Sequence, residues 1–149
     1  RHRLALLGLP EEHLDEAQQR SCSALVKVLA DVQGRWILGP HPEAQCEFAL
    51  NAWLDDRLQT LIIDRTFISD DGTRWIIDYK TSALDEELAA QTEALAAFVE
   101  HERQRYLPQL QNYARVLATL QGGAHVRPIR AALYLPLMQC FIELETGLG

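Results

Sequence analysis

Two short apolar runs, joined by an aspartate–glycine turn, constrain the fold of this 149-residue chain more than any other feature. Residues 58–68 (LQTLIIDRTFI) and 73–80 (TRWIIDYK) are rich in β-branched and aromatic side chains, which favours strands. The residues between them, Ser-Asp-Asp-Gly, end in a strong hairpin signal. We therefore predict an antiparallel pair in which the numbers of partner residues sum to about 142.

This hairpin is expected to bring charged side chains together. Alternate residues of a strand share a face, so Asp78 and Lys80 should point to the same side. In the predicted register, Asp64 lies opposite Asp78 or very near it. Glu47 belongs to an earlier strand-like run, 44–54, in which it lies on the face opposite the large apolar residues. The sequence therefore predicts a shared patch of acids with one lysine.

Helical patterns precede and follow these strands. Residues 11–33 have apolar positions close to helical spacing, and Gly34 is placed to end that helix. Further along, Pro108 suits a first helical turn, which predicts a second helix over 107–120. Residues 81–101 are acidic and alanine-rich with weak periodicity. A loop, a loose helix and a segment that orders on binding are all compatible with that composition.

Two final strands are expected at 129–138 and 140–144. The element order predicts an α/β fold, with a mixed sheet flanked by helices, in one domain over residues 1–149. The chain has no apolar run of about 18 residues, so no membrane span is expected. Its three cysteines are widely separated, which favours a reduced, cytoplasmic protein over a disulfide framework.

Net charge gives little guidance about a nucleic-acid partner. The formal charge is −7, which alone would disfavour DNA. However, residues 101–130 contain five arginines against one acid. An acidic site that expects divalent cations also looks repulsive when its metal is left out of the count. The charge therefore neither supports nor excludes DNA.

The predicted patch has the groups needed for metal-assisted phosphodiester hydrolysis. Two close carboxylates repel each other, and Mg²⁺ or Mn²⁺ would compensate them while keeping waters and bridging to phosphate. Lys80 would orient or activate the attacking water and stabilise charge on the phosphate. The expected mechanism is direct attack of a metal-activated water on the scissile phosphate. The alternative is structural: an Asp78–Lys80 ion pair, with Asp64 capping a turn.

The motifs resemble those of a known nuclease family. Ile63-Asp64-Arg65, followed by Trp75-Ile76-Ile77-Asp78-Tyr79-Lys80-Thr81, looks like the nuclease domain of RecB and AddA helicase–nucleases. That family has an aspartate on one strand and D-Y-K-[TS] on the next. Gln109 and Tyr113 match its Q-x-x-x-Y motif, which distinguishes the RecB branch of the PD-(D/E)xK nucleases. The similarity extends over roughly residues 43–137.

The resemblance implies a restriction-endonuclease-like fold with Asp64 and Asp78 as metal ligands and Lys80 as the catalytic lysine. Glu47 resembles the family's upstream acid and is expected to assist, while Gln109 and Tyr113 contact DNA or support the site. The whole protein is then expected to be an exonuclease of double-strand break repair and recombination. Its helicase region, an ATP-dependent part of the same polypeptide, and an AddB-like or RecC-like partner subunit would lie outside this chain.

Two departures from the family pattern affect these expectations. Leu61 stands where the family usually has glycine, three residues before the first aspartate. The family also has a metal-ligating histidine on an N-terminal helix, and neither His2 nor His13 has that context. Both are expected to be surface residues. We expect the ligating histidine upstream of Arg1, in which case an isolated C-terminal fragment would bind metal poorly and lack activity.

Two other functions compete with this one. A nuclease-like module could bind DNA or a partner subunit without cutting, although intact acids and lysine argue against a decayed site. A CRISPR-associated or AddB-like nuclease with an iron–sulfur cluster would need four suitably spaced cysteines, whereas this chain has three scattered ones.

Overall fold

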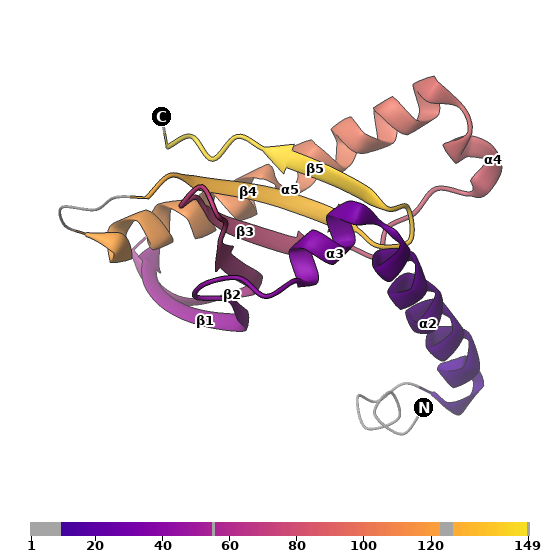
Figure 1. Ribbon diagram of the computed structural model, residues 1–149, viewed down its shortest axis with the longest axis horizontal. Coiled ribbons are helices and arrows are strands. Elements are labelled where there is room, and N and C mark those ends of the chain that lie inside the picture. Colours follow the sequence, from indigo (N-terminus) through magenta and orange to yellow (C-terminus); the bar gives the residue numbers. More distant parts are fainter. Residues whose placement is uncertain (1–9, 55, 123–126, 149) are drawn as a thin grey trace.

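A computed structural model describes residues 10–54, 56–122 and 127–148. Within them, five strands form one sheet in the order β1-β2-β3-β4-β5 (Figure 1). The strands are β1 (Gln45–Leu54), β2 (Arg57–Ile68), β3 (Arg74–Tyr79), β4 (Ile129–Leu135) and β5 (Cys140–Leu144). Neighbouring strands are antiparallel except β3 and β4, which are parallel. The prediction of a mixed α/β protein is therefore confirmed.

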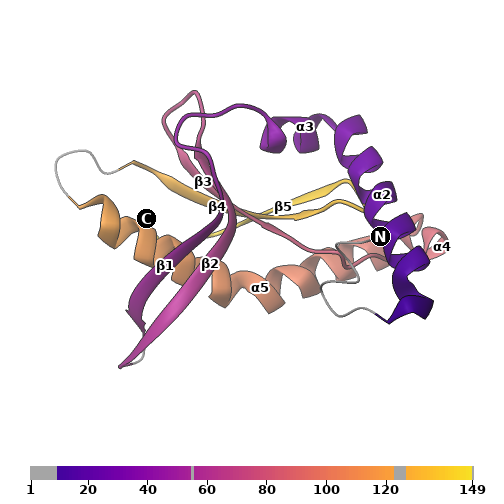
Figure 2. The same cartoon turned by 90° about the horizontal axis from the view of Figure 1, so that it is seen from below.

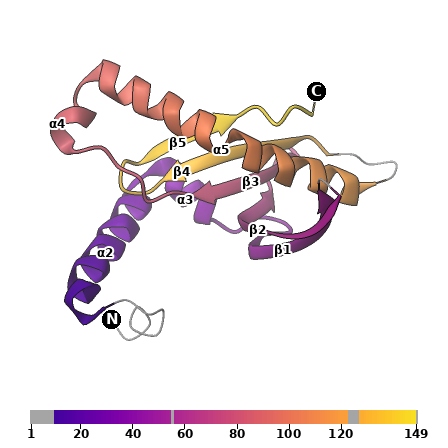
Figure 3. The ribbon, with the colours of Figure 1, turned by 180° about the vertical axis from the view of Figure 1, so that it is seen from behind.

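Five helices accompany the sheet in the described residues, and they cover both of its faces. The helices are the short η1 (Glu11–His13), α2 (Leu14–Ala30), α3 (Val32–Leu38), α4 (Glu86–Ala89) and α5 (Thr92–Gln121). Because parallel neighbours need a crossover connection, the chain leaves the sheet after β3 and returns to β4 through α5. Figures 2 and 3 show α5 across one face and α3 on the other. Only the C-terminal end of α2 joins that second side, where Val28 packs with the core, and the rest of α2 extends away from the sheet. No described helix has the length and hydropathy to cross a membrane.

The pairing of β2 with β3 confirms the predicted register. The residue numbers of every pair sum to 142: Arg65 with Ile77, Thr66 with Ile76, Phe67 with Trp75 and Ile68 with Arg74. In the turn, Gly72 has a φ of 83°, a left-handed conformation that glycine adopts without strain. The Asp71 carboxylate accepts hydrogen bonds from the Ser69 hydroxyl (2.6 Å) and the Thr73 amide (3.0 Å). These contacts fix the turn and therefore the register.

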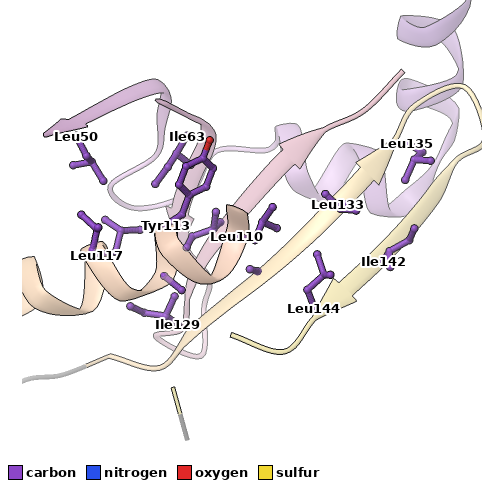
Figure 4. Packing of buried hydrophobic residues seen from close by; sticks show 14 residues of the cluster. Leu50, Ile63, Leu110, Tyr113, Leu117, Ile129, Leu133, Leu135, Ile142 and Leu144 are labelled. Atoms are coloured by element: carbon purple, nitrogen blue, oxygen red, sulfur yellow. The ribbon is translucent and has the colours of Figure 1, made fainter. Parts of the chain in front are cut away.

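Apolar side chains form a core on each face of the sheet. Beneath α5, Ile63 and Leu133 of the sheet pack with Leu110 of the helix, as Figure 4 shows. On the other face, a smaller cluster joins α2 and α3 to aromatic side chains of β2, β3 and β4. Burying one such large apolar side chain contributes about 1.5–3 kcal/mol. The sheet is thus held from both sides.

The N-terminal helix differs from the prediction of one helix over 11–33. The chain breaks at Asp31, whose extended backbone separates α2 from α3. The Asp31 carboxylate caps α3 by accepting from the Gly34 amide (2.9 Å), and it also accepts from the Tyr134 hydroxyl (2.7 Å). Gly34 does not end a helix but lies within α3. A Cβ there would meet the Val28 carbonyl oxygen at 2.5 Å and the Tyr134 hydroxyl at 2.6 Å, so close packing requires the glycine.

Helix α5 is much longer than predicted. It begins at Thr92 and contains Pro108 in its interior, so the prediction of a first turn at Pro108 is wrong. The proline is exposed. Much of the segment 81–101 is helix, in α4 and the start of α5. Its periodicity is weak because Glu102 is the only buried residue in the first half of α5.

Replacing the helix cap tests the junction of α2 and α3. Asp31→Ala removes the acceptor of both the Gly34 amide and the Tyr134 hydroxyl. We expect the free energy of unfolding, measured by urea denaturation, to fall by about 1–3 kcal/mol. Asp85→Ala is the matched control because Asp85 precedes α4 without a capping hydrogen bond. Its effect should stay within about 0.5 kcal/mol, and equal losses in both variants would contradict the assigned role.

Candidate functional site

Two charged side chains at the end of β3 face α5. Asp78 and Lys80 follow Ile76, a core residue beneath α5, at alternate positions. Asp78 is 2% exposed, and its Oδ2 forms an ion pair with the Lys80 ammonium. The Lys80 amide donates to the Tyr134 carbonyl of β4 (3.0 Å), so the backbone of Lys80 is anchored to the neighbouring strand. The predicted shared face of the acid and the lysine is confirmed.

Asp64 lies on β2 where the ladder with β3 ends. The last pair is Arg65 with Ile77, and the next position in that register places Asp64 opposite Asp78. The Asp64 carboxylate accepts a hydrogen bond through Oδ2 from the Tyr79 amide (2.8 Å). A side-chain oxygen thus takes the place of a backbone partner. This hydrogen bond holds the Asp64 carboxylate beside the end of β3.

Burial leaves the Asp78 carboxylate incompletely compensated. Desolvation raises its pKa, the hydrogen bond and charge of Lys80 lower it, and the charge of Asp64 raises it further. The net pKa is above the ordinary value, and the two acids are close enough to repel each other. An additional cation here would offset both the desolvation and the repulsion.

Helix α5 supplies three polar aromatic or amide side chains to the same patch. The Lys80 ammonium lies 4.3 Å from the centre of the Tyr106 ring, which is a cation–π contact. Further along the helix, the Gln109 amide donates to the Tyr113 hydroxyl (2.6 Å). Burial raises the pKa of Tyr113, and the charges of the two site carboxylates raise it further. The Tyr113 hydroxyl therefore lies within electrostatic range of both acids.

The sequence pattern located Gln109 and Tyr113 but missed Tyr106. The hydrogen bond between the first two confirms that they share a helix face. Tyr106 lies about two turns before Tyr113 on that face, a spacing visible in the sequence. Starting the predicted helix at residue 107, on the strength of Pro108, left Tyr106 outside it.

Glu47 lies beside Asp64 on the other side of the sheet. Its φ of 50° breaks the alternation of β1. As a result Phe48 packs beneath α5, whereas Cys46 lines a groove on the side of α2 and α3. Glu47, Asp64 and Tyr79 line this groove of about 400 Å³ together with apolar residues of the two helices. The predicted third acid therefore shares with Asp64 a groove on the face away from α5.

The described residues place the charge of Asp64 near Asp78 but show no larger set of ligands. Among them, no group of three or more His, Cys, Asp or Glu side chains is arranged to hold a metal. His13 is exposed and pairs with Glu12 (3.7 Å), as expected of a surface residue. His2 lies outside the described residues.

No protein-family model matches this chain, and no curated protein sequence matches it with significance. Any function of this chain must therefore be inferred from the chemistry of the side chains that the structure describes.

The raised pKa of Asp78 leads to a prediction about stability and pH. Because the pKa of Asp78 is higher in the folded than in the unfolded protein, ionising this carboxylate lowers the free energy of unfolding. The full cost applies at a pH above the folded-state pKa. This cost disappears as the pH falls below the unfolded value near 3.8. We therefore expect metal-free Asp78→Asn to be more stable than the wild type at pH 7, with a difference that shrinks on acidification.

Urea denaturation over a pH series measures this difference. Asp70→Asn is the control, because Asp70 is exposed in the turn of the same hairpin. It should match the wild type throughout. An Asp78→Asn protein that is less stable than the wild type at pH 7 would show that the Lys80 ion pair outweighs the desolvation.

Proposed function

We propose that this chain is a divalent-metal-dependent nuclease domain that hydrolyses DNA, with Asp64, Asp78 and Lys80 at its centre. The observation that carries the proposal is the buried carboxylate of Asp78. A second acid lies across the hairpin, and the ammonium of Lys80, two residues further along the chain, pairs with Asp78. Burying like charges together is costly, and such groups concentrate at functional sites. A cation held between the acids would account for the cost.

The donor set fits Mg²⁺ or Mn²⁺. These ions prefer oxygen ligands, keep several waters, and are commonly held by one or two carboxylates together with substrate phosphate. Asp64 and Asp78 each use one oxygen, Oδ2, in their protein contacts and have a second oxygen for a cation. When bound, the cation would supply Lewis-acid activation of the phosphodiester and of a water. Glu47, on the far side of Asp64, would assist through water.

Lys80 would orient the attacking water and stabilise the charge that develops on the phosphate. The lysine is already held by the Asp78 ion pair, by its backbone bond to Tyr134 and by the Tyr106 ring. An ammonium fixed in this way needs little reorganisation during the reaction. The hydrogen-bonded side chains of Gln109 and Tyr113 would contact the DNA or brace the catalytic strand.

The architecture supports a restriction-endonuclease-like fold of the RecB and AddA class. The sheet is mixed and flanked by helices, and the acids lie on two paired strands. The D-Y-K-T run begins on the last two residues of β3 and continues just beyond it, while the Q-x-x-x-Y residues form a hydrogen-bonded pair on the crossover helix. The resemblance of these motifs to that class leads us to propose that the domain belongs to a helicase–nuclease that degrades DNA ends during break repair. Its helicase region and an AddB-like or RecC-like subunit would be partners.

Incubation of the full-length polypeptide with linear DNA and Mn²⁺ tests the activity. We expect degradation that stops when the metal is chelated. Asp64→Ala, Asp78→Ala and Lys80→Ala should each lower the rate by about 100-fold or more. Asp70→Ala removes an exposed acid from the same hairpin and should retain the wild-type rate.

Degradation that survives Asp78→Ala or Lys80→Ala would contradict the assignment. The competing function, a module that binds DNA or a partner without cutting, makes a different prediction. It requires DNA binding with no degradation and no heat of Mn²⁺ binding in a calorimetric titration. That combination in the full-length polypeptide would replace the nuclease proposal.

The Tyr106 ring provides a second prediction. Tyr106→Phe keeps the ring beneath the Lys80 ammonium, whereas Tyr106→Leu keeps apolar bulk without it. A cation–π contact contributes about 0.5–2 kcal/mol, so the leucine variant should lose about 2- to 30-fold in kcat. The phenylalanine variant should stay within about twofold of the wild type. Equal losses in the two variants would show that the ring does not hold Lys80.

A further inference from the structure

Arg65 follows Asp64 on β2. Although it is charged, the residue is buried, with 8% of its surface exposed. Its Nε donates to the Ile37 carbonyl (2.6 Å), and its Nη2 donates to the Gly39 carbonyl (2.9 Å). Its Nη1 donates to the Cys46 sulfur (3.3 Å). One rigid side chain thus bonds acceptors from two other segments of the protein.

The two carbonyl acceptors lie at the C-terminal end of α3. The last carbonyls of a helix lack partners within it, and a positive charge is favourable at that end. A buried guanidinium is itself costly unless its donors are satisfied. Both requirements are met by the same contacts. Arg65 therefore ties β2 to the end of α3 from inside the protein.

Strand β2 changes faces at Asp64. Before it, Leu61 and Ile63 pack beneath α5. After it, Arg65 and Phe67 pack on the side of α3. Alternate residues of a regular strand would keep to one face, so the chain rotates at Asp64. The paired strand β1 has a left-handed residue at the same level. The direction of the Asp64 carboxylate depends on how this rotation is fixed.

Two contacts fix the rotation of β2 at Asp64. The Tyr79 amide holds the Asp64 carboxylate, and the guanidinium of Arg65 holds the next residue against α3. We infer that Arg65 is a positioning residue for the metal-dependent reaction, an inference that rests on the proposed function. Its three-donor fork locks the rotation that keeps the Asp64 carboxylate beside Asp78. Lysine cannot replace it, because an ammonium on a flexible stem has no planar fork.

Amide hydrogen exchange in the metal-free Arg65→Lys protein tests the positioning directly. The Tyr79 amide donates to Asp64, whereas the adjacent Lys80 amide donates to the Tyr134 carbonyl. If the carboxylate shifts, exchange at Tyr79 should quicken by about fivefold or more while exchange at Lys80 is unchanged. Equal acceleration at both amides would indicate general destabilisation and would overturn the inference.

Metal affinity and kinetics give the functional readout in the full-length polypeptide. Arg65→Lys should lose about 10- to 100-fold in Mn²⁺ affinity, with the KM for DNA within about twofold of the wild type. Saturating Mn²⁺ should restore much of kcat. Arg130→Lys is the matched control, because Arg130 of β4 also bonds two oxygens (2.5 and 2.7 Å), those of Glu143, but its side chain is half-exposed. It should keep wild-type affinity and kcat.

The outcomes separate this inference from the proposed function. A wild-type protein that binds no Mn²⁺ and leaves DNA intact would end the proposed function, and the inference would fall with it. If the wild type binds Mn²⁺ and cuts DNA, and Arg65→Lys equals it in Mn²⁺ affinity and in kcat, the inference alone is overturned. If Arg65→Lys does not fold, Arg65→Gln serves instead. It keeps an amide donor, buries no charge and should show the same losses.

Discussion

The antiparallel pairing of β2 with β3 determines where the charged groups of this protein meet. Its register places Asp64 level with Asp78 and leaves the Asp64 carboxylate to accept from the Tyr79 amide. A slip of one residue would turn every side chain of β3 to the other face. Asp78 and Lys80 would then leave the side of the sheet that α5 covers. The turn that sets this register is therefore the element on which the whole site depends.

Charge burial links the stability of the fold to its proposed chemistry. Asp78 is almost fully enclosed, its pKa is raised by desolvation, and Lys80 compensates it only in part. An apolar pair of similar size would often be as stable or more stable in such a place. A site that is less stable than its alternatives is understandable if a bound cation and an anionic substrate complete its charge balance. The Tyr106 ring, which lies against the Lys80 ammonium, adds a cation–π contact to this site.

Local sequence rules sufficed for the hairpin register and for the shared face of Asp78 and Lys80, because strand alternation and the Asp-Gly turn act over a few residues. They failed where distant residues decide the structure. The helix break at Asp31 depends on Tyr134, 103 residues away in sequence. The rotation of β2 depends on contacts that Arg65 makes with α3, 26 and 28 residues earlier. Pro108 misled the prediction of α5 because packing against the sheet outweighs the helix-breaking preference of a single residue.

Anomalous diffraction from crystals of the full-length polypeptide grown with Mn²⁺ tests whether Asp64 and Asp78 together hold a cation. We expect one anomalous peak within about 2.0–2.3 Å of a carboxylate oxygen of both Asp64 and Asp78. The peak should disappear in Asp78→Asn crystals. The absence of a peak between the two acids at saturating Mn²⁺, or a peak that persists unchanged in the variant, would contradict a metal site shared by Asp64 and Asp78.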